Sequence, residues 1–246
     1  MSYYKYDDKK IYYIDRGEGN TLIILPGNTV SSNVHKNEIE FFVDNNFRVI
    51  CPDYIGYGKS DRVEKLPVNF WYENAKMIIS LMKHLNISNY SIIGTSGGAL
   101  IGLNIAAMVP DKIDNLVADS FRLEFNEKVV KNIVSDRNNI EEGQKYFWQM
   151  AHGNDWQDVI EKDSQMFMEF AKTQDQIIKD DIGKISCEVL LTGSIKDSLI
   201  PDIQKQLNYI LKRVNNSKAI IYSKGDYPVI WSQALEFRKD VVNFIT

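Results

Sequence analysis

The residues with the clearest chemical potential form a glycine-serine-glycine pattern near the middle of the chain. Gly94, Ser96 and Gly98 lie between a β-branched run that starts at Tyr90 and a stretch of small and apolar residues over 97–108. A serine between a strand and a helix can be held on a sharp turn that exposes its hydroxyl, and glycines serve where side chains would clash. The pattern therefore predicts Ser96 as a nucleophile.

The segments around Ser96 alternate between strand-like and helical patterns. β-branched and apolar runs predict strands, and the stretches between several of them have helical character. Alternation of this kind predicts an α/β fold with a mostly parallel twisted sheet and helices on both faces. The expected strands are 11–15, 21–25, 47–51, 90–93, 115–118, 188–192 and 219–222, and the expected helices between them include 32–45, 70–85 and 97–108.

Residues 121–185 break this alternation. They contain almost no strand pattern, and Trp156, Ile160, Phe167 and Phe170 fall at helical spacing on one face. We expect a helical cap over 121–185 inserted into a core made of 1–120 and 186–246. The apolar face can simply pack on the core, or it can contact substrate, in which case Trp156 and Phe167 are the candidate substrate-binding residues.

Composition narrows the possible partners. The 246 residues include 33 acidic and 29 basic residues, which gives a net charge of −4 and no basic block for binding nucleic acid. The apolar stretch 91–109 is interrupted by polar side chains, so no membrane span is expected. We expect no metal, because no zinc-ligand spacing is present, and no cofactor. The N-terminus has no apolar signal segment, and Cys51 and Cys187 are expected to be free buried thiols in the reducing cytoplasm.

Several motifs in order resemble the α/β-hydrolase fold superfamily, and in particular its capped esterase- and lipase-like members. Residues 11–19 resemble the opening hairpin, and Leu25-Pro-Gly-Asn28 resembles the loop that usually carries His-Gly before an oxyanion-hole residue, with Pro26 replacing the histidine. Residues 52–61 resemble the Asp-x-x-Gly-x-Gly-x-Ser segment of the family. Residues 191–197, followed by Pro201, resemble its acid loop. This resemblance covers nearly the whole chain.

The resemblance implies a division of chemical work around Ser96. A serine hydroxyl needs a base to remove its proton and donors to stabilise the oxyanion that forms. The backbone N–H groups of Asn28 and Gly97 would be those donors, and Asp197 would orient a histidine. Asp119, at the end of the strand 115–118, is an alternative acid position in some relatives, although a capping or turn role is also open for it.

The chain departs from the family at the histidine itself. No histidine follows His152, and alignment backwards from Phe237 puts Tyr227 in the histidine position, with Asp226 as the alternative after a one-residue shift. Neither replaces histidine well, because tyrosine stays protonated near neutral pH and aspartate is a weak base. His152 in the cap is the other candidate base, whereas His35 and His84 are expected to be structural or solvated.

Two classes of function follow from this departure. The first is a serine hydrolase for a small ester, amide or thioester that uses Ser96 and is impaired by the lost histidine. The second is a ligand-binding or regulatory protein that keeps the pocket of a hydrolase without turnover. Both imply a small-molecule substrate or ligand, and the sequence leaves the oligomeric state undetermined.

Overall fold

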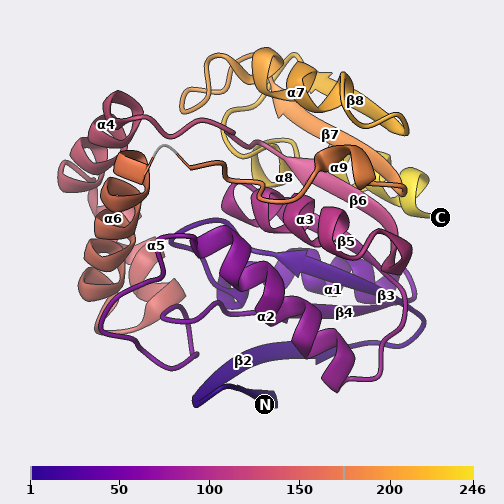
Figure 1. Ribbon diagram of the computed structural model, residues 1–246, viewed down its shortest axis with the longest axis horizontal. Coiled ribbons are helices and arrows are strands. Elements are labelled where there is room, and N and C mark those ends of the chain that lie inside the picture. The colour runs from indigo at the N-terminus through magenta and orange to yellow at the C-terminus, as the bar shows by residue number, and fades with distance from the viewer. Residues whose placement is uncertain (1, 174) are drawn as a thin grey trace.

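The computed structural model describes residues 2–173 and 175–246 and has one eight-stranded sheet. Six neighbouring strands run parallel, and the two N-terminal strands add an antiparallel edge (Figure 1). The strand order is β1-β2-β4-β3-β5-β6-β7-β8. The strands are β1 (Ser2–Tyr6), β2 (Lys9–Arg16), β3 (Asn20–Leu25), β4 (Phe47–Pro52), β5 (Tyr90–Thr95), β6 (Ile113–Asp119), β7 (Glu188–Ser194) and β8 (Ser217–Tyr222). The expected α/β sheet is therefore confirmed, with β1 as an additional strand that the sequence patterns did not predict.

Helices cover both faces of this sheet. One face carries α2 (Phe70–His84) and α3 (Gly97–Met108), which pack on each other and on the central strands. The opposite face carries α1 (Lys36–Asp44), α8 (Val229–Ser232) and α9 (Ala234–Ile245). Apolar residues therefore fill both faces of the central strands, as expected for a parallel sheet buried on both sides.

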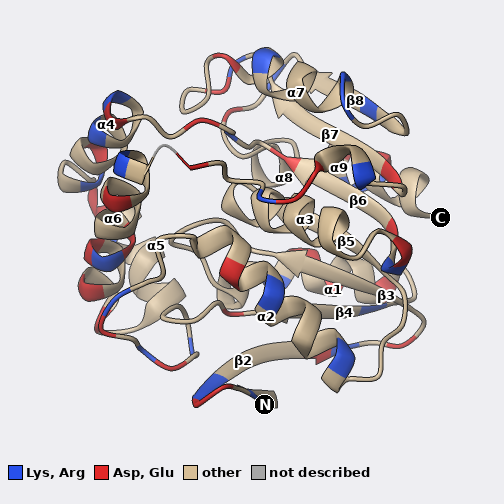
Figure 2. Ribbon diagram, viewed as in Figure 1, with Lys and Arg blue, Asp and Glu red and all other residues tan. Residues whose placement is uncertain are grey.

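Three helices stand apart at one end of the molecule. They are α4 (Glu127–Asn138), α5 (Glu142–His152) and α6 (Trp156–Thr173), and they lie beside the carboxyl ends of the parallel strands (Figure 1). Acidic and basic residues both occur along α4 and α6 (Figure 2), and seven residues of α6 are buried. The chain returns to the sheet through a short 3-10 turn at Ile182–Lys184, and α7 (Ile203–Leu211) then joins β7 to β8.

These helices fall within 121–185, where a cap was expected from the sequence. The division into a core and a cap remains a prediction.

No described helix combines the length and the apolar composition needed to cross a bilayer. Cys51 and Cys187 are both free and buried.

Candidate active site

Ser96 occupies a strained turn between β5 and α3. Its backbone dihedrals are φ 56° and ψ −118°, a conformation that non-glycine residues rarely adopt. Its N–H donates to the Asp119 carbonyl oxygen at 2.8 Å, which ties the turn to the end of β6. Ser96 is only partly buried, although the flanking Thr95 and Gly97 are buried. The strained backbone at Ser96 therefore places its side chain at the carboxyl ends of the strands.

The glycines next to Ser96 allow β5, α3 and the loop after β3 to approach closely. A Cβ atom on Gly98 would overlap the Leu25 carbonyl oxygen and lie 2.6 Å from that of Pro26. A Cβ on Gly27 would lie 3.2 Å from Ser96 Cβ and 3.8 Å from its Oγ. The Pro26–Asn28 loop thus lies directly against Ser96, and small residues at 27 and 98 make this possible.

Asn28 lies over the first turn of α3. Its side-chain oxygen accepts from the Trp71 indole N–H at 3.0 Å and would overlap a Cβ on Gly97. The backbone N–H groups of Asn28 and Gly97 donate to no acceptor among residues 2–173 and 175–246. Two free N–H groups beside a serine have the chemistry of an oxyanion site.

Asp197 lies in the loop after β7 and is buried. Its Oδ1 accepts from the backbone N–H groups of Leu199 at 3.0 Å and Ile200 at 2.7 Å. Its Oδ2 is buried and has no hydrogen-bond partner among the described residues. Burial raises the pKa of this carboxyl above its ordinary value. A buried carboxylate oxygen without a donor is costly, so Asp197 has the form of an orienting acid whose partner is missing.

Tyr227 is the residue predicted at the histidine position. Burial raises the pKa of its phenol above the ordinary value, and hydrogen bonding with the Ser96 side chain opposes this effect only in part. Asp197 and Asp119 raise it further through their charges. Tyr227 therefore stays protonated near neutral pH, where it can donate a hydrogen bond but cannot accept a proton from Ser96.

Asp226, the adjacent candidate, faces the other way. It is exposed, and its carboxylate accepts from the backbone N–H and the hydroxyl of Ser198 at 2.8 and 3.0 Å. It also accepts from the N–H of Tyr227 at 2.7 Å. These hydrogen bonds lower its pKa. The structure therefore brings Tyr227 to Ser96 and directs Asp226 to the acid loop at the surface.

Asp119, the alternative acid, is fully buried and fully partnered. It accepts from Thr192 Oγ1 at 2.8 Å, from Ser120 Oγ at 3.0 Å and from the N–H of Ile230 at 3.2 Å. Burial raises its pKa to about 7. Its contacts hold the start of α8, which follows Tyr227, so they support a structural role.

His152, the histidine considered as an alternative base, uses both ring nitrogens in contacts with groups other than Ser96. The Nδ1 of His152 accepts from the N–H of Gly58 at 3.1 Å, and its Nε2 lies 3.0 Å from the Thr29 carbonyl oxygen. Both ring nitrogens are therefore occupied in the neutral tautomer. His35 is buried against Trp231 with ring centroids 5.3 Å apart, and His84 packs on Tyr4 of β1 at 4.8 Å.

A buried polar cluster beside Asn28 was not predicted from the sequence. Asp163 on α6 is fully buried, pairs with Arg137 on α4 at 2.7 Å, and accepts from the Asn28 side-chain amide at 2.8 Å and from the Tyr57 hydroxyl. These residues come from four separate segments. No periodicity or local motif indicates such a cluster, although an aspartate on the apolar face of 156–173 was a signal that could have been noticed.

The two expected substrate-binding residues lie in different surroundings. Phe167 is buried and packs edge-to-face on Trp71, with ring centroids 5.4 Å apart. Trp71 in turn donates a hydrogen bond to Asn28. Trp156 packs on Trp148 at 5.7 Å, inside the group of three helices. Phe167 therefore lies close to the oxyanion loop, and Trp156 contacts its own helical layer.

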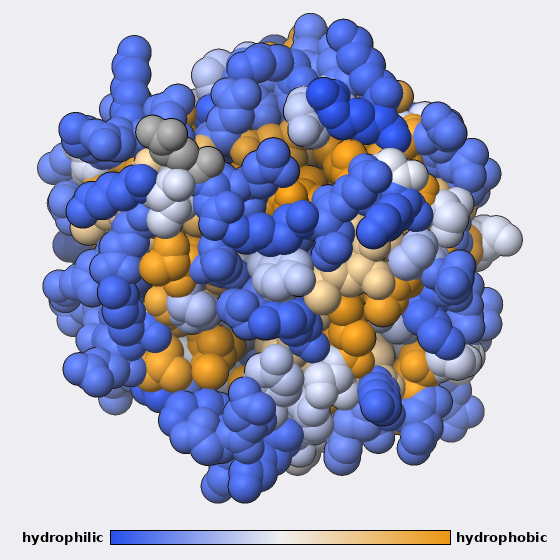
Figure 3. Space-filling model, in the orientation of Figure 1, coloured by the Kyte–Doolittle hydropathy of each residue, from blue (hydrophilic) through white to orange (hydrophobic). Residues whose placement is uncertain are grey.

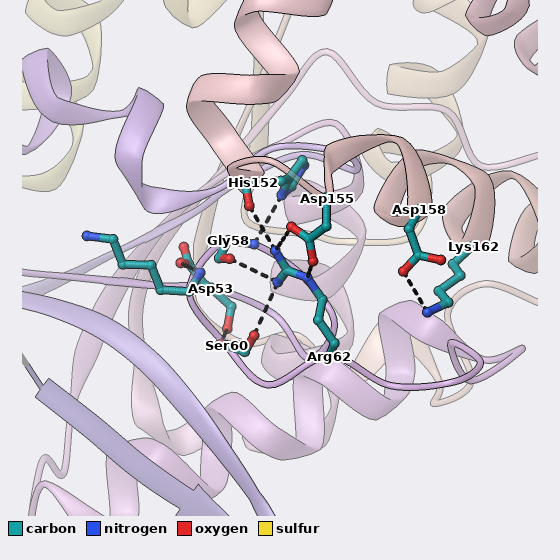
Figure 4. Close-up of polar contacts among 9 residues, drawn as sticks. Asp53, Gly58, Ser60, Arg62, His152, Asp155, Asp158 and Lys162 are labelled. Carbon is teal, nitrogen blue, oxygen red and sulfur yellow. Dashed lines mark hydrogen bonds and ion pairs between the residues drawn. The ribbon is translucent and has the colours of Figure 1, made fainter.

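Arg62 joins the loop after β4 to the turn between α5 and α6 (Figure 4). Its guanidinium donates to both carboxylate oxygens of Asp155 at 2.7 and 2.9 Å. It also donates to the carbonyl oxygens of Gly58 at 2.9 Å and of His152 at 2.8 Å. This network anchors His152 and the beginning of α6 to the core.

Among the described residues, no His, Cys, Asp or Glu cluster suits a metal ion.

Comparisons with known proteins agree with this geometry. The family model for the alpha/beta hydrolase fold matches residues 20–180. A haloalkane dehalogenase of Mycolicibacterium paratuberculosis is 32% identical over 110 residues, which are 44% of this chain and 36% of that protein. The 2-hydroxy-6-oxo-6-phenylhexa-2,4-dienoate hydrolase of Comamonas testosteroni is 24% identical over 277 aligned positions, covering 97% of this chain and 92% of that protein.

Solved structures show the same fold at low sequence identity. An esterase from Exiguobacterium antarcticum superposes with a TM-score of 0.78 at 18% identity, over 97% of this chain and 96% of its own. The chain therefore spans little more than a third of the dehalogenase but nearly all of this esterase. Together with the strained serine turn and the mostly parallel sheet, the family match leads to one conclusion: the chain belongs to the alpha/beta hydrolase fold family.

Proposed function

We propose that this protein is a serine hydrolase that acts slowly on a small ester, amide or thioester. Ser96 is the nucleophile, the N–H groups of Asn28 and Gly97 form the oxyanion site, and residues 121–185 act as a cap. The observation that carries the proposal is the strained Ser96 turn beside two N–H groups that have no partner in the described chain. Hydrolases among the relatives support the same reaction class.

The reaction would begin with attack of Ser96 Oγ on the carbonyl carbon of the substrate. The carbonyl oxygen then takes negative charge, which the two N–H groups stabilise, and the tetrahedral intermediate collapses to an acyl-serine and a free alcohol, amine or thiol. Water completes the cycle by releasing the acid. The attacks by Ser96 and by water each need a proton acceptor, and the proton removed must then pass to the leaving alcohol, amine or thiol, or back to Ser96. Tyr227 is a donor there, so we expect proton removal to limit the rate.

The size of the expected defect follows from studies of intact triads. Loss of the histidine from a serine protease lowers kcat about 10⁶-fold, while oxyanion stabilisation and binding alone retain about 10³- to 10⁴-fold over water. Slow turnover therefore remains compatible with the geometry around Ser96.

The second candidate is a ligand-binding protein without turnover. The observation that favours it is the combination of a protonated, partly buried Tyr227 with an Asp197 oxygen that has no partner among the described residues. The fold would then retain a pocket next to Ser96 in which a bound ligand is held but not cleaved.

Labelling with an active-site-directed fluorophosphonate separates the two candidates. This reagent reacts with serines that are activated and placed beside an oxyanion site. We expect slow, saturable labelling of Ser96 that is abolished in Ser96→Ala, with mass spectrometry locating the adduct. Folded protein that remains unlabelled after prolonged incubation would favour the ligand-binding candidate.

A further inference from the structure

A groove separate from Ser96 lies between the end of α6, the following segment and α7. Its volume is about 930 Å³, which falls within the range of small-molecule sites. A second hollow of about 400 Å³ adjoins it and shares Ile178, Tyr209 and Arg213. On this face of the molecule, apolar side chains lie in patches bordered by hydrophilic ones (Figure 3). The groove is large enough for an elongated organic molecule.

The inner wall of the groove is aromatic and reaches towards the reaction centre. Phe125 and Phe170 line the groove, and both pack on Trp71, with ring centroids at 5.2 and 5.0 Å. Phe125 stacks face to face on Trp71 with an interplanar angle of 5°. Trp71 in turn donates to Asn28. One pair of stacked rings therefore separates the groove from the oxyanion loop.

The groove lining carries three basic side chains, Lys205, Lys212 and Arg213, and two acidic ones, Glu124 and Asp175. Asp180 and Asp181 line the adjoining hollow. Glu124 and Lys205 neutralise each other at 3.2 Å, and Asp175 pairs with Lys179. Lys212 and Arg213 have no carboxylate within salt-bridge distance in the part of the chain that the structure describes. Arg213 lies over the Tyr209 ring at 3.7 Å, which holds its guanidinium beside the groove.

We propose that this groove binds an amphipathic carboxylate, with the apolar body against Phe125 and Phe170 and the carboxylate at Lys212 and Arg213. An apolar wall and two cations without a carboxylate partner in the described chain complement a molecule that has a hydrocarbon end and an anionic end. Binding at this groove requires no turnover at Ser96, so it can be tested whether or not the protein is a hydrolase.

The test is an equilibrium titration with octanoate, using calorimetry together with tryptophan fluorescence to detect changes at Trp71. Octanol and octylamine, which carry the same chain without the negative charge, are the comparison ligands. We expect saturable octanoate binding that is at least about tenfold tighter than binding of octanol or octylamine, because each exposed cation contributes a modest attraction.

Variants assign that binding to the groove. Lys212→Glu with Arg213→Glu should weaken octanoate binding about tenfold or more, and Phe125→Ala should weaken binding of all three ligands. A matched double charge reversal at exposed positions outside the groove, Lys224→Glu with Lys239→Glu, should leave the affinity unchanged. Circular dichroism confirms that each variant is folded.

Two results would overturn the proposal. Equal affinity for octanoate and octanol, unaffected by reversal at 212 and 213, would show apolar partitioning without recognition of the carboxylate. Equal loss in both charge-reversal variants would show a general effect of net charge. Absence of saturable octanoate binding to the wild type would likewise exclude the site, without bearing on fluorophosphonate labelling of Ser96.

Discussion

At the residue scale of the proposed function, Asp197 is the acid, the N–H groups of Asn28 and Gly97 are the donors, and Tyr227 stands at the expected histidine position. Asp197 keeps one carboxylate oxygen buried and unpartnered in the described chain, and the charges of Asp197 and Asp119 help to raise the pKa of Tyr227. Tyr227 can only donate a hydrogen bond, because burial keeps its phenol protonated. The chemical consequence is a nucleophile whose proton has no efficient acceptor near neutral pH.

The burial of His35 predicts that the folding stability of the protein falls at acidic pH. Burial lowers its pKa to about 4, and neither ring nitrogen has a hydrogen-bond partner in the described chain. The unfolded chain therefore binds a proton near pH 6.5 that the folded chain accepts only near pH 4, so stability falls as the pH drops through this window.

Replacing His35 with phenylalanine should remove this contribution, because the ring packing on Trp231 is kept and the buried titratable group is lost. The free energy of unfolding, measured by urea titration at pH 8 and at pH 5, should fall less on acidification in His35→Phe than in the wild type. An identical fall in both proteins would show that His35 does not titrate on unfolding.

At the element scale, the Ser96 turn depends on close contact between α3 and the loop after β3. Backbone carbonyl groups of Leu25 and Pro26 lie where a side chain on Gly98 would begin. Backbone cannot yield as a flexible side chain does, so any substituent must separate the two elements. The close approach of the Pro26–Asn28 loop to α3 thus depends on the absence of a side chain at Gly98.

Gly98→Ala should therefore destabilise the protein by more than about 2 kcal/mol and lower fluorophosphonate labelling of Ser96. The matched control is Gly143→Ala on α5, where an added Cβ meets nothing within 4 Å. That change should stabilise the protein by about 0.5 to 1 kcal/mol through helix propensity. Thermal unfolding measures both, and equal effects at the two glycines would contradict the close contact at Gly98.

The sequence predicted these elements unevenly. Buried strands such as β3 contain a continuous apolar run, Leu22-Ile-Ile-Leu25, so their pattern is strong, and the turn at Ser96 follows from local glycine spacing. β1 was missed because it is an edge strand without a run of buried residues. Its exposed Tyr3 and Lys5 alternate with half-buried residues. The cluster of Asp163, Arg137 and Asn28 joins residues far apart in the chain, so the sequence signals only the aspartate on the apolar face of 156–173 and not its partners.

At the scale of the whole molecule, two polar networks join the helices α4 to α6 to the sheet. Asp163 links α6 to the oxyanion loop, and Arg62 links the turn before α6 to the loop after β4. Asp163 is fully buried, so removing one of its partners would leave an uncompensated charge. The position of these helices is therefore coupled to the geometry beside Ser96.

Arg62→Met should weaken this junction by about 1 to 3 kcal/mol, because the carbonyl oxygens of Gly58 and His152 lose their charged donor. Lys65→Met is the control, since Lys65 forms a more exposed ion pair with Glu169 and should cost less than about 1 kcal/mol. Hydrogen exchange should show faster exchange in α5 and α6 of Arg62→Met. Unchanged protection there would mean that Arg62 does not hold these helices.

We propose that Ser96 lacks only a base. The most direct measurement is the rate of hydrolysis of a short p-nitrophenyl ester by Tyr227→His, alone and combined with Asp226→Gly, against the wild type and against the same variants carrying Ser96→Ala. A histidine at 227 can accept the Ser96 proton and donate to the free oxygen of Asp197. We predict that kcat/KM rises at least about 100-fold and that Ser96→Ala abolishes the gain. An unchanged rate in the folded Tyr227→His variants, together with wild-type activity that depends on Ser96, would contradict the account and show that another base already acts there.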